Sequence, residues 1–392
     1  MPLELTVAET LPEDRDRAVL VGRAWLPGTP GGPAVVTVRG DRVVDITGCA
    51  PTCSELLNRP SACAGASSAE GRDIGSLADI LAASALPAAG GTTPCLLAPV
   101  DLQAVKACGV TFAESMLERV IEERAKGDPS AADGIRSELR HAIGVDLGAV
   151  VPGSPEAARL KDMLIERGMW SQYLEVGIGP DAEVFTKAQP MSAVGTGAEI
   201  GIHSASSWNN PEPEIVLVIN ARGETVGATL GNDVNLRDVE GRSALLLGKA
   251  KDNNASAAIG PFIRLFDDDY GIDDVRSAEL ALRVTGPDGF VLDGSSSMSR
   301  ISRDPLALVA ETIGAHHQYP DGVCLMTGTL FSPTKDRDAP GGGFTHKLGD
   351  VVRISTPRLG TLANRVNHSE AVAPWTFGTG ALMRNLAERG LL

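Results

Sequence analysis

The chain has 392 residues, 43% of them hydrophobic, and a formal net charge of −15. This length fits one large domain or two, and the apolar content is enough for a sizeable core. The negative charge argues against nucleic acid or an anionic membrane surface as a partner, and no segment approaches the roughly 20 consecutive apolar residues of a membrane span.

The cysteines and the N-terminus bear on the cellular compartment. The segment Met1–Leu5 lacks the basic region and the apolar core of a secretory signal. The six cysteines form no Cys-x-x-Cys pair and match no zinc spacing; they are Cys49, Cys53, Cys63, Cys95, Cys108 and Cys324. We therefore expect a reduced, cytoplasmic protein.

The first hundred residues differ in pattern from the remainder. Residues 35–46 alternate between apolar and polar side chains around Gly40-Asp41, which predicts a β-hairpin. A short helix is predicted over Ser76–Ser84, and a stretch rich in proline and glycine follows it. We place a boundary near Pro99, with a small N-terminal α/β domain at 1–100 and a main domain at 101–392.

Two helices are predicted at the start of the main domain. Residues 111–126 have Thr111 as a candidate N-cap, Glu114 three residues later and Gly127 as a stop. This spacing is that of a capping box, which by itself explains a glutamate at position 114. A second helix is predicted over Pro155–Arg167.

From about residue 183 onward, short apolar runs alternate with turn signals, which is typical of strands. The predicted strands are Ile215–Ile219, Glu279–Thr285, Gly322–Met326 and Asp350–Ser355, and the predicted helices are Pro305–Gly314 and Thr379–Glu388. The fold class expected from this pattern is α+β and rich in β-structure. The run Gly341–Gly343 lacks the lysine and the helix start of a phosphate loop and predicts only a flexible loop.

Two carboxylates directly precede the most apolar predicted strand. Glu212 and Glu214 belong to the motif Pro-Glu-Pro-Glu at 211–214, just before Ile215–Ile219. Side chains two apart on a strand point to the same face, so these charges need a cation or a shared proton. A third acid, Asp233, ends the next predicted strand. Three hard oxygen ligands favour Mg²⁺ or Mn²⁺ over Zn²⁺.

Further short motifs follow these acids in order. They are Gly-Lys-Ala-Lys-Asp at 248–252, Ile-Gly-Pro at 259–261, Thr-Gly-Thr at 327–329, Leu-Gly-Asp-Val-Val at 348–352 and Gly-Thr-Leu-Ala-Asn at 360–364. The succession resembles the fumarylacetoacetate hydrolase superfamily over about residues 105–375. The resemblance implies a mixed β-roll catalytic domain and an assembly of two or four identical chains.

The resemblance also implies roles for particular residues. Glu212, Glu214 and Asp233 would hold Mg²⁺, with Mn²⁺ or Ca²⁺ as substitutes. Lys249 matches the active-site lysine of the family and would take a proton from C3 of a chelated 2-oxo acid. Two other positions match substrate-binding elements: Lys187, in a Phe-x-Lys motif, and Thr329, which would bond the substrate carboxylate.

One departure from the family pattern concerns the choice of reaction. Hydrolytic members carry Asn-Tyr-x-x-His-x-x-Glu, whose histidine and glutamate activate water, but the matching stretch at 111–118 has Phe112 for tyrosine and Ser115 for histidine. Glu118 alone is retained. The chain resembles instead a subgroup that dehydrates 2-keto-3-deoxypentonates, with Ser115 and Arg300 as further substrate-binding candidates and either Glu114 or Glu118 as the acid.

The sequence therefore predicts a Mg²⁺-dependent lyase. It would convert 2-keto-3-deoxyxylonate or -arabinonate to 2,5-dioxopentanoate (α-ketoglutarate semialdehyde) in non-phosphorylative pentose catabolism. One alternative is a hydrolase of acylpyruvates or 2,4-diketo-3-deoxy sugar acids, in which Glu118 and another base activate water. The other is a protein that keeps the scaffold and binds a 2-oxo acid without catalysis.

Overall fold

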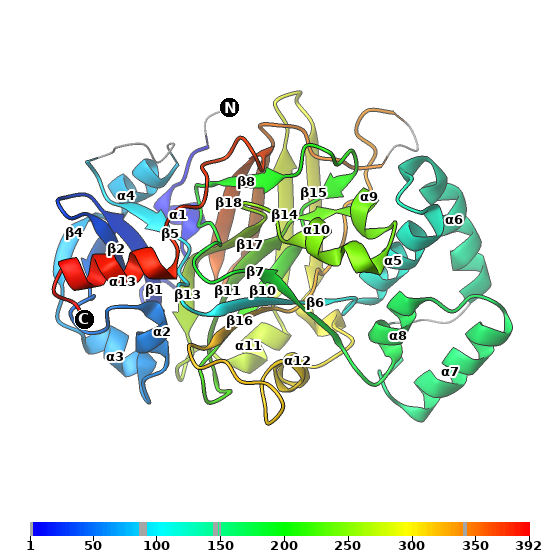
Figure 1. Cartoon of the computed structure of the whole chain (residues 1–392), viewed down its shortest axis with the longest axis horizontal. Coiled ribbons are helices and arrows are strands. Elements are labelled where there is room, and N and C mark those ends of the chain that lie inside the picture. Colours follow the sequence, from blue (N-terminus) through cyan, green and yellow to red (C-terminus); the bar gives the residue numbers. More distant parts are fainter. Residues whose placement is uncertain (1–2, 86–91, 144–147, 149, 340–342) are drawn as a thin grey trace.

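The computed structural model describes residues 3–85, 92–143, 148, 150–339 and 343–392 (Figure 1). Gly341 and Gly342 of the predicted loop lie outside these residues. Two large β-sheets pack face to face and helices flank them, as expected for a β-rich α+β protein. None of the helices within the described ranges has the length and apolar character needed to cross a bilayer.

The larger sheet has eleven strands in the order β4-β3-β2-β1-β13-β11-β10-β16-β6-β7, with β5 pairing with β1. Their bounds are β1 Leu20–Leu26, β2 Gly32–Arg39, β3 Arg42–Asp45, β4 Arg72–Ser76, β5 Cys95–Leu97, β6 Ala104–Gly109, β7 Glu183–Ala188, β10 Pro213–Ile219, β11 Thr225–Asp233, β13 Ala257–Leu265 and β16 Val323–Met326.

The second sheet has five strands in the order β15-β14-β17-β18-β8, and a two-stranded ribbon joins β9 to β12. The bounds are β8 Glu199–Ile202, β9 Asn209–Asn210, β12 Asn235–Leu236, β14 Glu279–Thr285, β15 Val291–Ser297, β17 Val351–Thr356 and β18 Gly360–His368.

The helices lie at the ends and outer faces of the sheets (Figure 1). They are α1 Val7–Thr10, α2 Cys53–Leu57, α3 Ala62–Ser68, α4 Leu77–Ser84, α5 Ala113–Ala125, α6 Pro129–Ile143, α7 Pro155–Glu166, α8 Gln172–Ile178, α9 Arg237–Glu240, α10 Leu247–Lys251, α11 Ile272–Arg276, α12 Pro305–Thr312 and α13 Thr379–Glu388, with 3₁₀ turns η2 Ala244–Leu246 and η3 Met298–Arg300. We call α5–α8 the helical arm; it packs on its own apolar cluster and projects on the right of Figure 1.

Strand β10 runs between two cores, which explains its uninterrupted apolar sequence. Ile215 and Leu217 face the core shared with the five-stranded sheet. Val216 and Val218 face the opposite core, which includes residues of α2 and α3. A strand buried on both faces has no polar side to alternate with, so only its N-terminal mouth is free to carry charge.

The first hundred residues join the main sheet. The predicted hairpin forms from β2 and β3, with Gly40 at a φ of 62° in the turn between them. Strand β1 then pairs antiparallel with β13, Leu20 lying opposite Arg264. A single sheet includes strands from both sides of residue 100. The division into two domains there stays a prediction.

The helix predicted at 111–126 forms as α5, but its start is different. Phe112 is the N-cap and its side chain makes no hydrogen bond, while the Thr111 hydroxyl donates to the carbonyl of Thr327, at 2.8 Å. The predicted capping box between Thr111 and Glu114 is therefore wrong. The C-terminal end agrees with the prediction, since Lys126 and Gly127 both have positive φ.

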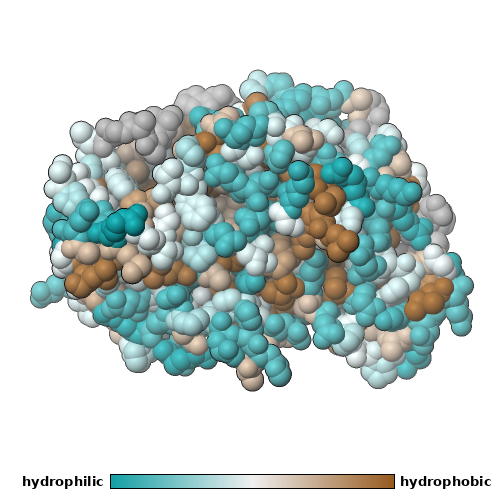
Figure 2. Space-filling model, in the orientation of Figure 1, coloured by the Kyte–Doolittle hydropathy of each residue, from teal (hydrophilic) through white to brown (hydrophobic). Residues whose placement is uncertain are grey.

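The surface in Figure 2 is mostly hydrophilic, with separate apolar patches. Large apolar side chains that are exposed in the described residues include Leu245 of η2, Ile165 of α7 and Met383 of α13. These side chains belong to three different elements.

Candidate metal centre

Strands β10 and β11 bring the three predicted acids together. Pro213 lies opposite Asn232 and Glu214 opposite Gly231 in the antiparallel register, and the Asp233 amide donates to the carbonyl of Glu212, at 3.1 Å. Residues directly opposite each other share a face of the sheet. All three acids therefore point to the same side, at the mouth of the strand pair.

The three carboxylates form a tight, buried cluster. One oxygen from each of Glu212, Glu214 and Asp233 lies within 4.8 Å of the others, and none of the residues is more than 2% exposed. The Oε2 atom of Glu214 accepts a hydrogen bond from the Gly328 amide, at 2.7 Å, while its buried Oε1 has no hydrogen-bond partner among the described residues. An unpartnered buried carboxylate oxygen is costly unless a cation meets it.

Three cationic side chains surround the cluster. The Nζ atom of Lys251 lies 2.6 Å from Glu212 and 3.1 Å from Asp233. Lys187 belongs to β7, the last strand of the sheet, and its Nζ lies 2.8 Å from Asp233. It also donates to the Val234 carbonyl, at 2.9 Å. The curl of the sheet thus brings β7 back to the end of β11. Arg119 of the helical arm pairs with the remaining oxygen of Glu212.

The lysine that contacts the acids is Lys251. The expectation that Lys249 would lie at the site is wrong. Lys249 is exposed at the surface, whereas the Lys251 side chain is 2% exposed and contacts two of the acids. Residues two apart on a helix point to nearly opposite sides, so α10 can bury only one of these lysines. Burial alone would lower the pKa of Lys251, but Asp233, Glu212 and Glu240 outweigh it and raise that pKa.

The charges of the cluster suit a divalent cation. Burial raises the pKa of Glu214 well above its usual value, and Asp233 and Glu212 add to that shift. Within the described part of the connected network, six buried acids meet four buried bases and the partly exposed Arg136, so the acids exceed the bases by one. The acids are Glu118, Glu122, Glu212, Glu214, Asp233 and Glu240, and the buried bases are Lys187, Lys251, Arg119 and Arg237. Hard oxygen donors and this excess fit Mg²⁺.

A chain of ion pairs continues from the cluster into the helical arm. Glu122 of α5 accepts from Arg119 at 2.6 Å and from Arg237 at 2.7 Å. Arg237 in turn donates to Glu118 at 2.9 Å, and Glu118 also pairs with Arg136 of α6, at 2.8 Å. Acids and bases alternate along the whole path, so each buried charge has an opposite neighbour.

These contacts change the expectation for Glu114 and Glu118 of the stretch at 111–118, which we call the lid. Glu118 is buried, but both of its oxygens are taken by Arg136 and Arg237. The two arginines lower its pKa although burial opposes that shift, which makes Glu118 a poor proton donor. Glu114 is exposed and pairs with Arg300 at 2.8 Å. The structure brings neither glutamate to the cluster as a free acid.

The other predicted site residues lie in three different environments. Arg300 is occupied by Glu114 at the surface and is not at the cluster. The Ser115 hydroxyl donates to the Phe112 carbonyl, at 2.8 Å within its own helix. Thr329 donates to the Phe331 carbonyl, at 2.9 Å, and directly follows Gly328, which contacts Glu214. Of the three, only Thr329 adjoins the acids.

Sequence reasoning missed Glu183, the first residue of β7. Its carboxylate lies over Gly109 of the paired strand β6, where an added Cβ would be 1.9 Å from Oε2. Burial raises the pKa of Glu183, against the charges of Arg119 and Lys251. No ion pair between described residues holds this carboxylate. It stands in no recognisable motif, so no sequence pattern points to it.

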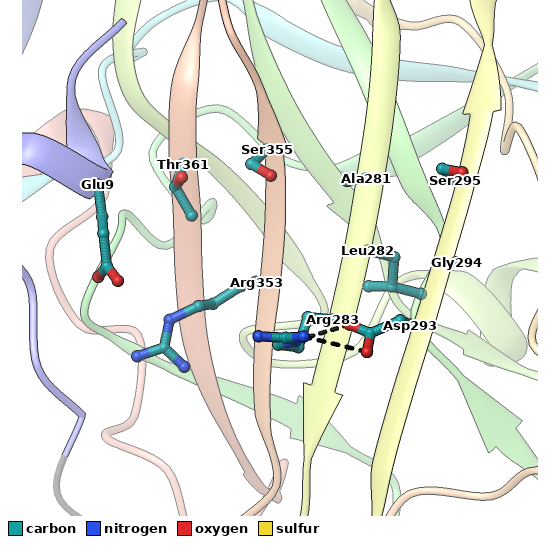
Figure 3. Close-up of a pocket in the computed structure, with 10 residues that line it drawn as sticks. All are labelled: Glu9, Ala281, Leu282, Arg283, Asp293, Gly294, Ser295, Arg353, Ser355 and Thr361. Atoms are coloured by element: carbon teal, nitrogen blue, oxygen red, sulfur yellow. Dashed lines mark hydrogen bonds and ion pairs between the residues drawn. The ribbon is translucent and has the colours of Figure 1, made fainter. Parts of the chain in front are cut away.

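A separate cavity of about 560 Å³ lies on the outer face of the five-stranded sheet (Figure 3). Arg283 of β14 pairs with Asp293 of β15 across its floor, at 2.6 Å, and Glu9 and Arg353 stand at its edge. None of the three clustered acids lines it. Its polar residues alternate with buried ones along each strand, as on any solvated sheet face.

Comparison with known proteins places the acids inside the range matched by a family model. The model of the fumarylacetoacetate (FAA) hydrolase C-terminal domain matches residues 168–367. A probable 2-keto-3-deoxyxylonate dehydratase of Haloferax volcanii is 32% identical over 201 residues, which are 51% of this chain and 65% of that protein. A 2-dehydro-3-deoxy-D-arabinonate dehydratase of Saccharolobus solfataricus is 31% identical over 184 residues, 47% of this chain and 58% of that protein. The matches thus span less than two thirds of either relative.

Solved structures show the same fold. A 2-keto-3-deoxy-D-arabinonate dehydratase complexed with magnesium and 2,5-dioxopentanoate superposes with a TM-score of 0.61 at 20% identity, over 89% of this chain and 99% of that one. The residues matched by the family model are more than half of the 392 and include Glu212, Glu214, Asp233 and Lys251. The chain therefore belongs to the fumarylacetoacetate hydrolase family.

Proposed function

We propose that this protein is a Mg²⁺-dependent dehydratase of a 2-keto-3-deoxypentonate, the xylonate or the arabinonate, with 2,5-dioxopentanoate as product in pentose catabolism. The buried acids with their excess of negative charge support a metal centre. The names of the two relatives support the substrate class. Glu212, Glu214 and Asp233 would hold the ion, which would act as a Lewis acid, polarise a 2-oxo acid and make its C3 protons acidic.

The observation that carries the choice of dehydration is the state of the lid. A hydrolase needs a base that can activate water, but position 115 is a serine bonded to its own helix. Glu118, the retained half of the dyad, is closed by two arginines. Dehydration needs no external nucleophile, so it does not require the lid residues to activate water.

The residues divide the proton transfers of the reaction. We assign the removal of a C3 proton to Lys251, because its Nζ lies against Glu212 and Asp233 where the 2-oxo acid would be held. These carboxylates raise the pKa of Lys251, and a divalent cation held by the same acids would oppose that shift and favour the neutral amine that this step needs. We assign the protonation of the departing C4 hydroxyl to Glu183, whose carboxyl group lies within range of the charges of Lys251, Glu212 and Asp233. Unlike Glu118, it is held by no ion pair between described residues. One water leaves. A proton then moves from C5 to C3, and the resulting C5 enol becomes the aldehyde as C4 gains a proton and the C5 hydroxyl loses one.

The direct test is incubation of the protein and Mg²⁺ with 2-keto-3-deoxyxylonate and separately with its C4 epimer. We expect one of them to give 2,5-dioxopentanoate with all five carbons retained, and NMR measures this conversion. A 2,4-diketo acid is the parallel substrate, since a hydrolase would cleave its C–C bond to pyruvate and a second acid. Cleavage of the diketo acid with neither pentonate consumed would refute the dehydratase proposal.

Replacement of Glu183 separates the two proton transfers. We expect Glu183→Gln to lower kcat by about 10²- to 10⁴-fold, the usual contribution of a general acid. Exchange of the C3 protons of 2-oxobutanoate into D₂O, followed by NMR, is expected to persist, because that step uses Lys251. The matched control is Glu114→Gln, which alters only an exposed pair with Arg300. If both variants keep wild-type kcat, the acid is another residue.

Other expectations from the resemblance stay predictions. They are an assembly of two or four identical chains, Mn²⁺ or Ca²⁺ as substitutes for Mg²⁺, substrate contacts by Thr329 and Lys187, and a cytoplasmic location. Of the two substrate-contact residues, Lys187 lies at Asp233 with its side chain fully buried, which supports a role beside the metal in place of direct contact with solvent-borne substrate.

A further inference from the structure

One buried guanidinium contacts three carboxylates from three elements. Arg119 of α5 lies 2.6 Å from Glu122 of the same helix and 3.1 Å from Glu240 of α9, and it pairs closely with Glu212 at the start of β10. The Arg119 side chain is 7% exposed. Its contacts join the helical arm, the turn after β12 and the acid cluster at one point.

The shape of the guanidinium suits this task. Its donors lie in a rigid planar fork and can serve several oxygens at once, whereas a lysine ammonium is a single point of charge on a flexible stem. Here Nη1 donates to Glu122 and lies within ion-pair distance of Glu240, and Nη2 donates to Glu212. Burial alone would lower the pKa of Arg119, but the three carboxylates outweigh it, so the group keeps its charge.

The network holds Arg119 from behind. Glu122 is fixed by Arg237 as well, at 2.7 Å. Arg237 stacks on the ring of Trp208 with its Cζ 4.4 Å from the ring centroid, and Trp208 is 3% exposed. Arg119 therefore cannot swing away without breaking packed contacts. Its Nη2 fixes one oxygen of Glu212, while Lys251 meets the other.

We infer that Arg119 is a positioning residue that fixes the orientation of Glu212 toward the metal ion. This inference rests on the metal centre proposed above and adds that the helical arm sets the geometry of that centre. Outer-shell partners that orient ligands are worth about 10- to 100-fold in metal affinity. Arg119 differs from the other members of the network in touching a ligand and the arm together.

Arg119→Lys tests the inference without changing charge. We expect Mg²⁺ affinity of the metal-free protein, measured by calorimetry, to fall by about 10- to 100-fold. A pure loss of positive charge beside the cluster would have the opposite effect, since it would strengthen the attraction for Mg²⁺. If Arg119→Lys folds poorly, the double variant Arg119→Met/Glu240→Gln serves in its place, because it removes the guanidinium and keeps the net charge. The same fall in Mg²⁺ affinity is expected for it.

Arg136→Lys is the matched control, because Arg136 pairs with Glu118 but not with Glu212. We expect it to shift the melting temperature of the metal-free protein as much as Arg119→Lys does, with Mg²⁺ affinity unchanged. Wild-type affinity in Arg119→Lys, or an equal fall in Arg136→Lys, would overturn the positioning role. Glu214→Gln run in parallel distinguishes the two proposals: if it also binds Mg²⁺ normally, the metal centre itself is misplaced and both fail.

Discussion

Glu214→Gln is expected to weaken Mg²⁺ binding by at least about 100-fold, the upper end of what loss of an outer-shell partner costs. Glu214 supplies a buried oxygen without a hydrogen-bond partner in the described structure, and its charge is one of three in the cluster. A neutral amide keeps the shape of the side chain and removes that charge. Calorimetry on the metal-free protein measures the effect directly.

The control for this variant lies on the same strand pair. Glu224→Gln alters an exposed glutamate in the turn between β10 and β11, where it pairs with Arg222 at 2.7 Å. Mg²⁺ affinity is expected to stay at the wild-type value in this control. Wild-type affinity in Glu214→Gln itself would exclude the assignment of these three acids as the metal ligands.

Although Glu214→Gln should weaken Mg²⁺ binding, it is expected to stabilise the metal-free protein. Burial together with Asp233 and Glu212 disfavours the charge on Glu214, so replacing it with a neutral side chain removes an unfavourable interaction. The melting temperature without Mg²⁺ should rise, while stabilisation by added Mg²⁺ should shrink, because a ligand stabilises only in proportion to its binding. A lower melting temperature without Mg²⁺ would mean that the Glu214 carboxylate stabilises the metal-free fold, contrary to this expectation.

The acids could be predicted from sequence because their geometry is local. The mouth of an apolar strand and the end of the next strand meet when the two pair, and Pro213 does lie opposite Asn232. The predicted boundaries of α4, α7 and α13 agree closely with the structure, and the first two of these helices begin at side-chain N-caps, Ser76 and Ser154. Signals within ten or twenty residues of each other were enough for these elements.

The roles of the lid residues depend on contacts that no local pattern encodes. The Thr111 hydroxyl bonds Thr327, which is 216 positions away, and this removed the predicted capping box. Glu118 meets Arg237, 119 positions away. A motif alignment identifies such a glutamate by position, but only the fold reveals that arginines already occupy it. The pairing of β1 with β13 is equally remote in sequence.

The two lysines of α10 provide the sharpest test of the proposed chemistry. Lys251→Met is expected to lower kcat by at least about 100-fold, the lower end of general acid–base contributions, and to abolish exchange of the C3 protons of 2-oxobutanoate into D₂O. Mg²⁺ affinity should not fall, because the variant removes a positive charge that lies 2.6 Å from Glu212 and 3.1 Å from Asp233. This combination separates Lys251 from the metal ligands, whose loss impairs binding first.

Lys249→Met is the control two residues away on the same short helix. Its side chain is exposed, so kcat, C3 exchange and Mg²⁺ affinity are all expected to match the wild type. Loss of exchange in Lys249→Met with full activity in Lys251→Met would restore the assignment based on motif position and would require α10 to rotate in the working protein. Loss in both would indicate that α10 as a whole, through its packing beside β12, is needed to hold the site.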